Sequence, residues 1–95
     1  MVQGDFPMVE VLRLRPLEGH KLWLRFTDGS EGARDLSDIL AKNGPMIEPL
    51  KSPEYFGRVF VETGVPTWPN GFDVAPEWLR REMAAAGELS QVAAE

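Results

Sequence analysis

The sequence predicts an α+β domain, in which one antiparallel sheet of about five strands has two helices packed to one side. Three observations support this class. Apolar and polar side chains alternate over 12–15 and 22–27, as in strands with one buried face. Asp28-Gly29, a dipeptide that favours hairpin turns, follows the second of these segments. Apolar residues with helical spacing follow Pro76. The predicted order of elements is β-β-β-α-β-β-α.

The first strand is expected over 8–15. Its alternation places Leu12 and Leu14 on the core face, because successive side chains of a strand point to opposite faces. Val9 and Val11 have the opposite parity. We therefore predict either a bulge near Val11 or a strand that begins with two apolar faces.

The next two strands complete a predicted meander. Residues 16–19 are expected to form a turn, because proline cannot extend a hydrogen-bonded ladder and glycine tolerates positive φ. A second strand follows over 22–27. Asp28-Gly29 then predicts a type I′ turn, which needs positive φ at both central residues. The chain is expected to pair back as a short third strand over 30–35, whose small residues offer little side chain to pack.

The second half of the chain alternates between helices and strands. A short helix is expected over 36–42, where apolar residues recur at helical spacing. Residues 46–57 contain two prolines and a glycine, so we expect them to wrap the surface as a connection, in which one turn around Glu54-Tyr55-Phe56 stays open. Two strands follow over 58–62 and 65–68, the second at an edge because it contains proline. The last helix is predicted over 76–86, since proline suits a first helical turn.

The composition is that of one small globular domain. The chain has 95 residues, 43% of them hydrophobic and 26% charged. We expect a flexible arm over 1–7, a single α+β domain over 8–87 and a frayed tail over 88–95. The lack of cysteine excludes disulfides and thiolate metal ligands. No apolar run is long enough to cross a bilayer, and the first residues lack the cationic start of a signal peptide. We therefore expect a cytoplasmic protein.

Residue patterns that carry catalysis or bind metals are few. The one histidine, His20, cannot supply a zinc ligand set without cysteines, and its position beside a predicted turn favours a solvated side chain. The sequence thus predicts no metal and no cofactor. A carboxylate-dependent enzyme would rely on Asp35 and Asp73. Each of them precedes a predicted helix, so capping of backbone N–H groups is the favoured interpretation for both.

Aromatic residues are concentrated in 68–79, which holds two tryptophans and one phenylalanine. Two interpretations stay open for Trp68 and Trp78. Their rings either cap the core or lie exposed for a partner, since aromatic anchors are favoured at protein contacts. Trp23 alternates with in-facing leucines, so its indole must occupy the second face of the sheet. The candidate partner-binding residues are Trp23, Phe60, Trp68, Asn70, Phe72, Asp73 and Trp78.

Arginines on the first strands form an alternative site. Arg13, Arg15 and Arg25 have the parity to share one sheet face, and Arg34 is a further candidate. They would serve a small DNA-associated transcriptional regulator. The net charge of −5 opposes this function, because an acidic protein repels phosphates. Solvated arginines are therefore the favoured interpretation, and nucleic acid is the less favoured partner.

Four motifs carry a family resemblance. They are Leu24-x-Phe26-x-Asp28-Gly29, Asp35-Leu36, Leu50 with Phe56, and Trp68-Pro69-Asn70-Gly71-x-Asp73-Val74-Ala75-Pro76-Glu77-x-Leu79. Together they resemble the bacterial family Domain of Unknown Function 2442 (DUF2442) over residues 8–83. Arg80 departs from the pattern, because the family has tyrosine or another apolar residue there. The resemblance implies a small α+β domain without an assigned activity. It also implies a neighbouring gene for a Domain of Unknown Function 4160 protein, an arrangement like a toxin–antitoxin pair.

These observations predict a non-enzymatic protein-interaction module, similar to the antitoxin-like member of a toxin–antitoxin pair. The acidic charge, the surplus of aromatic residues and the lack of a nucleophile–base set support it. The expected partner is another protein, such as the product of an adjacent gene. A homodimer formed along an edge strand is compatible with this function. The DNA-associated regulator and the carboxylate-dependent enzyme stay open as alternatives.

Overall fold

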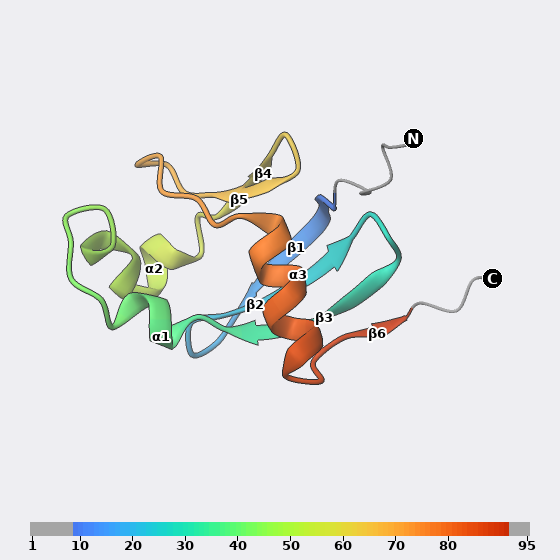
Figure 1. Cartoon of the computed structure of the whole chain (residues 1–95). Coiled ribbons are helices and arrows are strands. Elements are labelled where there is room, and N and C mark those ends of the chain that lie inside the picture. Colours follow the sequence, from blue (N-terminus) through green and yellow to red (C-terminus); the bar gives the residue numbers. More distant parts are fainter. Residues whose placement is uncertain (1–8, 92–95) are drawn as a thin grey trace.

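The structure, a computed structural model, describes residues 9–91. Its main sheet is antiparallel and has the strand order β1-β2-β3-β6. The strands are β1 (Val11–Leu17), β2 (Lys21–Phe26), β3 (Ser30–Asp35) and β6 (Ser90–Gln91). The α+β class and the predicted meander of the first three strands are therefore confirmed (Figure 1).

The last described residues extend the main sheet. β6 pairs antiparallel with β3, and the half-buried Leu89 just before it packs against the core. The prediction of a frayed tail over 88–95 is therefore wrong as far as Gln91, because a core contact and strand pairing hold this segment. Positions 92–95 lie outside the described residues, as does the arm expected over 1–7.

The predicted single sheet of about five strands is wrong. β4 (Phe60–Glu62) and β5 (Val65–Thr67) form a separate two-stranded sheet. This hairpin meets β1 at its turn, where the Val11 N–H donates to the Gly64 carbonyl oxygen at 2.9 Å. The opposite edge of the main sheet is occupied by β6. The hairpin therefore lies beside the main sheet without extending either of its edges.

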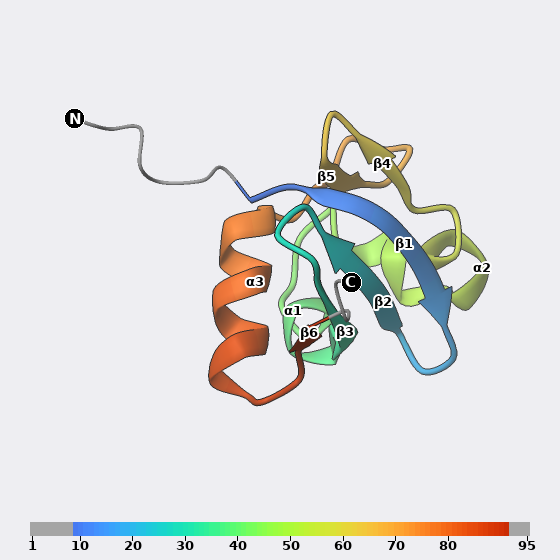
Figure 2. The same cartoon turned by 90° about the vertical axis from the view of Figure 1, so that its right-hand side faces the viewer.

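Residues 9–91 contain three α-helices and a 3₁₀ turn, where the sequence predicted two helices and left open one turn around 54–56, the place of α2. They are α1 (Ser37–Leu40), η1 (Glu48–Lys51), α2 (Pro53–Phe56) and α3 (Pro76–Ala85). The additional elements lie in 46–57, in which proline occupies the first turn of both η1 and α2. Proline fits there because its missing N–H has no helical partner at that position. α3 covers one face of the main sheet (Figures 1 and 2).

The core fills the space between the main sheet and the helices. Leu22, Leu24 and Phe26 are buried on one face of β2, as their alternation predicts. α3 adds the buried side chains of Leu79 and Met83. The other buried apolar side chains of the core are Val11, Leu36, Leu40, Leu50, Phe56, Val59, Trp68 and Val74.

A bulge near Val11 is confirmed, since the register of β1 against β2 shifts between Val11 and Arg13. Val11 is buried, and Leu14 packs against the core. The prediction that Leu12 also faces the core is wrong, because the bulge takes it out of the alternation and leaves it 57% exposed.

The type I′ geometry predicted for Asp28-Gly29 occurs at another hairpin. Thr63 and Gly64 join β4 to β5 and both have positive φ, of 52° and 79°. At the β2–β3 hairpin the φ of Gly29 is 90°, whereas Asp28 has negative φ. There the Gly29 N–H donates to the carbonyl oxygen of Phe26 at 3.0 Å. The loop is thus the three-residue kind, in which a final left-handed glycine returns the chain to the ladder.

The first hairpin turn lies further along the chain than predicted. Pro16 was expected in the turn, but it pairs with Leu22 inside β1. Proline is tolerated here because β1 is an edge strand. On the unpaired side of such a strand, a backbone nitrogen without a hydrogen costs no hydrogen bond of the sheet. Gly19 and His20 carry the turn instead, with φ of 76° and 61°.

Candidate functional site

A tight loop after β5 positions the aromatic residues. The Trp68 N–H donates to the Phe72 carbonyl oxygen at 2.9 Å, and the Gly71 N–H donates to that of Trp68 at 2.8 Å. The side-chain amide of Asn70 donates to the Met46 carbonyl oxygen at 3.0 Å. Its own Oδ1 accepts from the Phe72 N–H at 3.1 Å. Asn70 therefore fixes the loop to the segment before η1, which gives it a structural role.

Trp68 lies in the core, 1% exposed. Its Nε1–H donates to the Phe56 carbonyl oxygen at 2.9 Å. The ring centroids of Phe56 and Phe72 lie 5.6 and 5.8 Å from the Trp68 ring. Of the two interpretations left open for Trp68, the core position is the one found. Its indole is therefore closed to a partner, and it supports the half-buried ring of Phe72.

A groove of about 350 Å³ lies between α1, the loop after β5 and the start of α3. Its apolar lining consists of Ile39, Ile47, Phe72, Val74, Ala75 and Trp78. Phe72 and Trp78 are half-buried, and both also pack against the core. Their rings are consequently held in place from behind while one side of each faces the groove. A concave apolar surface of this kind suits an apolar side chain of a ligand or partner.

Two charged residues, Lys42 and Asp73, complete the lining of the groove. Asp73 is exposed, and its backbone forms an isolated β-bridge with Thr67. The prediction that Asp73 caps the following helix is wrong. α3 begins at Pro76 with Ala75 as its N-cap residue, and no side chain caps it. The Asp73 carboxylate stands too early in the chain for capping and instead gives the groove a negative charge.

The candidate partner-binding residues are only partly brought together. Phe72, Asp73 and Trp78 line the groove. Trp23 points to the sheet face that is turned away from the core, and Phe60 is 42% exposed on β4. Sequence reasoning missed the groove residues that precede the aromatic cluster, namely Ile39, Lys42 and Ile47. No pattern in the sequence links them to the cluster, because tertiary packing brings them there.

The arginines of the alternative site are divided between the two sheet faces. Arg13 is directly opposite Arg25, and Arg13 and Arg15 have the same parity on β1, so these three share a face. Arg34 is opposite the buried Leu22 and therefore lies on the core face. Its Nη1 makes an ion pair with Glu88 Oε1 at 3.1 Å. The expectation that Arg34 joins the other arginines is wrong.

The two other singled-out residues lie outside the groove. The Asp35 carboxylate accepts from the Ser37 N–H at 2.8 Å, so it satisfies a backbone donor at the start of α1, as predicted. Asp35 is not the cap itself, because Leu36 occupies the N-cap position and no side chain caps α1. Hydrogen bonds from Ser37 hold the pKa of Asp35 below its ordinary value. His20 is half-buried, with Nε2 3.0 Å from the Lys51 carbonyl oxygen and its ring edge-on to Phe56. The prediction of a solvated histidine is wrong, because these two contacts hold the ring against η1 and α2.

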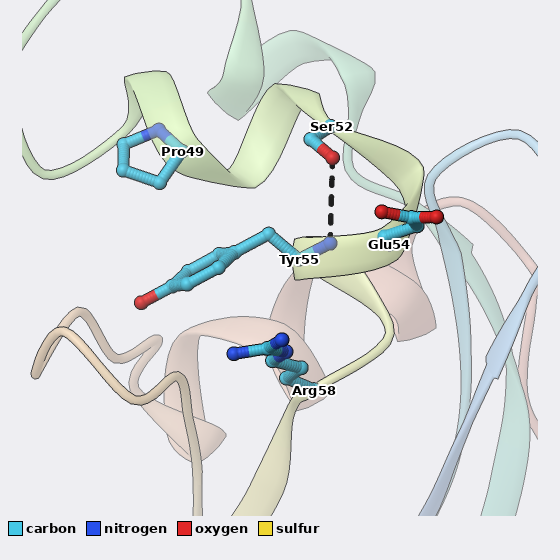
Figure 3. Close-up of a pocket in the computed structure, with 5 residues that line it drawn as sticks. All are labelled: Pro49, Ser52, Glu54, Tyr55 and Arg58. Carbon is cyan, nitrogen blue, oxygen red and sulfur yellow. Dashed lines mark hydrogen bonds between the residues drawn. The ribbon is translucent and has the colours of Figure 1, made fainter.

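A second hollow, of about 320 Å³, lies beside α2 (Figure 3). It is lined by Pro49, Ser52, Glu54, Tyr55 and Arg58. The Arg58 guanidinium lies 5.9 Å from the Tyr55 ring centroid, a cation–π distance. Ser52 Oγ accepts from the Tyr55 N–H at 3.5 Å, where α2 begins. This hollow was not predicted, since residues 46–57 were expected to form a connection on the surface.

Within residues 9–91, no three His, Cys, Asp or Glu side chains lie close enough together to hold a metal ion. No helix in this part of the chain has the length and apolar character needed to cross a membrane.

Comparison with known proteins identifies a family. The model of a family described as protein of unknown function (DUF2442) matches residues 11–85. The matched segment runs from the start of β1 to the end of α3 and contains every residue that lines the groove. No curated protein and no solved structure matches the chain.

Proposed function

Because this chain belongs to the DUF2442 family of proteins of unknown function, we propose its role from the groove: it binds another protein and catalyses no reaction. The observation that carries the proposal is the apolar groove between α1 and α3, with the half-buried rings of Phe72 and Trp78 in its wall. Rings that are fixed from behind by the core bind a partner with little loss of side-chain entropy.

The chemistry of the groove defines what the partner must present. An apolar side chain inserts beside Phe72 and Trp78, and polar groups next to it meet Lys42 and Asp73. The net charge of the chain, −5, favours a basic partner, since charge complementarity raises the association rate. We assign the partner to the product of an adjacent gene, with this chain as the antitoxin-like member of the pair.

The first test fills the groove without removing any side chain from the core. Ala75 is exposed and lines the groove, whereas Ala84 is exposed on α3 outside it. We expect Ala75→Arg to weaken binding of the adjacent gene product at least about 30-fold, the effect of losing a 2 kcal/mol anchor. Ala84→Arg, which makes the same change on α3 outside the groove, should leave the affinity unchanged. Calorimetric titration of the purified pair measures both.

A second variant tests the aromatic wall directly. Trp78→Ser should weaken binding by a similar factor, and thermal unfolding shows whether the variant is folded. Co-expression with the partner should relieve any growth arrest that the partner alone produces, and Ala75→Arg should abolish that relief. The proposal is wrong if the adjacent gene product does not bind, or if the two alanine variants bind equally well.

A further inference from the structure

The register of β1 to β3 gathers cations on the sheet face turned away from α3, which we call the open face. Gly32 belongs to the opposite face, because a Cβ placed there would lie 3.4 Å from Met83 Cε on α3. Arg13 is opposite Arg25, Arg15 is opposite Trp23, and Leu17 is opposite Lys21. The cations of the open face are Arg13, Arg15, Lys21 and Arg25.

The open face is positively charged although the chain as a whole is acidic. Glu31 and Asp35 are the carboxylates that β3 places on it. Glu31 is engaged by Arg25, with 3.0 Å between Oε1 and Nη2. Within residues 9–91, Arg13 and Arg15 make no ion pair. Arg13 is directly opposite Arg25, and like charges in this arrangement destabilise a sheet. An anionic ligand would relieve this repulsion.

Trp23 lies among these cations. It is half-buried, yet it does not pack against the core as the other half-buried aromatic rings of residues 9–91 do. The Arg15 guanidinium lies 5.6 Å from the centroid of its ring. Its neighbour on β3 is the exposed Ala33, whose methyl group covers little of the indole. The guanidinium lies over a face of the indole, so Trp23 already stacks a planar cation, and a nucleobase can take that place when Arg15 turns to a phosphate.

We propose that the open face binds a single strand of nucleic acid, with a base stacked on Trp23 and phosphates held by Arg13 and Arg15. Arginine suits this role because its planar guanidinium binds phosphate with two hydrogen bonds. A ring between the cations favours nucleic acid over an acidic peptide, whose carboxylates need no stacking surface. In a duplex the bases are already stacked and do not reach Trp23. The groove of the proposed function lies on the α3 side of the sheet, so the two proposals stand independently.

The test is the fluorescence anisotropy of a labelled oligothymidylate of about 12 nucleotides, within the usual site size for single strands. The full chain is titrated to about 100 μM, the weak end of non-specific binding. With two phosphate contacts, the logarithm of the binding constant falls against the logarithm of the salt concentration with a slope of about −1.4. The affinity should therefore fall roughly sevenfold between 50 and 200 mM salt. The unlabelled duplex of the same length should compete more weakly than the unlabelled single strand.

Variants separate stacking from charge. Trp23→Leu should weaken binding at least about fivefold through loss of the base stack. Arg13→Gln should weaken it and make the salt slope shallower by about 0.7. Arg81→Gln removes the same charge from an exposed position on α3 and should change nothing. Because Arg13 is exposed, its variant keeps the test decisive even where Trp23→Leu fails to fold.

Four results would overturn the proposal. One is the absence of any anisotropy change at 50 mM salt, where phosphate contacts are strong. Another is an equal loss of affinity in Arg13→Gln and Arg81→Gln, which would show that the oligonucleotide is attracted by the charge of the protein and does not bind at the open face. The third is equal or tighter binding of the duplex. The fourth is displacement of the oligonucleotide by polyglutamate at equal charge concentration, which would assign the open face to an acidic protein instead.

Discussion

Thr63 has a backbone conformation that β-branched residues rarely adopt. Its φ of 52° places it in the left-handed region, where the branched side chain crowds the backbone. The two-residue turn between β4 and β5 requires this conformation, because its other residue, Gly64, also has positive φ. The residue at this position therefore suits the turn less well than asparagine or glycine would.

This strain makes Thr63→Asn a stabilising substitution. Asparagine tolerates the left-handed region and is favoured in turns of this type, so we expect the free energy of unfolding to rise by about 1 kcal/mol. Urea unfolding followed by tryptophan fluorescence measures the change. Thr27→Asn, in a turn residue without positive φ, is the matched control and should not stabilise. Equal or lower stability of Thr63→Asn would contradict this account of the hairpin.

At the scale of elements, the segment that leads from α3 to β6 packs directly on β3, and this packing depends on one glycine. A Cβ at Gly32 would lie 2.0 Å from the carbonyl oxygen of Glu88, in the segment that leads from α3 to β6. The contact is with backbone, so no side-chain rotation relieves it. Arg34 binds the Glu88 side chain from the same strand. The segment between α3 and β6 can therefore pack this closely on β3 only because residue 32 has no side chain.

Gly32→Ala is accordingly expected to destabilise the fold. Overpacking of a close contact costs about 1–3 kcal/mol, and the backbone acceptor places this substitution toward the upper end. Gly57→Ala is the matched control, because an added Cβ there meets ordinary contacts of 3.5 Å and the φ is −71°. Chemical denaturation of both variants measures the difference. If the two variants were equally stable, α3 and β6 would not lie as close to β3 as described.

A carboxylate joins the β2–β3 turn to α3. Asp28 Oδ1 accepts hydrogen bonds from the Ser30 N–H and hydroxyl, and its Oδ2 accepts from Arg80 Nε at 2.9 Å. Burial raises the pKa of Asp28, but the hydrogen bonds from Ser30 and the Arg80 guanidinium together outweigh burial. The pKa therefore lies below its ordinary value of 3.8. These hydrogen bonds also hold the loop in its three-residue form.

A lowered carboxyl pKa makes stability depend on pH with a defined sign. The folded state favours ionised Asp28, so its stabilisation is complete above the ordinary pKa and is lost as the pH falls through the lowered value. Asp28→Asn keeps an acceptor for Ser30 but loses the charge. The difference in unfolding free energy between wild type and this variant should be present at neutral pH and shrink below about pH 4. Arg80→Gln should reduce the same difference, and a difference independent of pH would contradict the assignment.

At the scale of the whole molecule, local patterns predicted the elements and tertiary contacts decided the rest. The alternation of Leu22, Leu24 and Phe26 was sufficient for the meander, and proline marked the start of α3. β6 could not be foreseen, because its pairing depends on the close approach of Glu88 to Gly32. The assignment of side chains to sheet faces from their alternation also failed where a bulge or a different turn changed the register of the strand.

The candidate site was predictable to the same extent. The sequence singled out Phe72 and Trp78, because aromatic residues are concentrated near the Asn-Gly turn. It could not separate them from Trp68, whose burial depends on the packing of Phe56 and on the acceptor that this residue supplies. Ile47 lines the groove because the Asn70 side chain holds its neighbour Met46 against the loop after β5. Contacts between segments distant in sequence leave no local pattern.

Pro16 has a consequence for how copies of this chain meet. It lies within β1, an edge strand of the main sheet, beside the exposed Leu17. A strand of another molecule that paired with β1 would find no amide proton at Pro16 and would lose one hydrogen bond of the ladder. Open-ended stacking into fibrils, to which uncovered apolar borders are prone, is thereby interrupted at its first step.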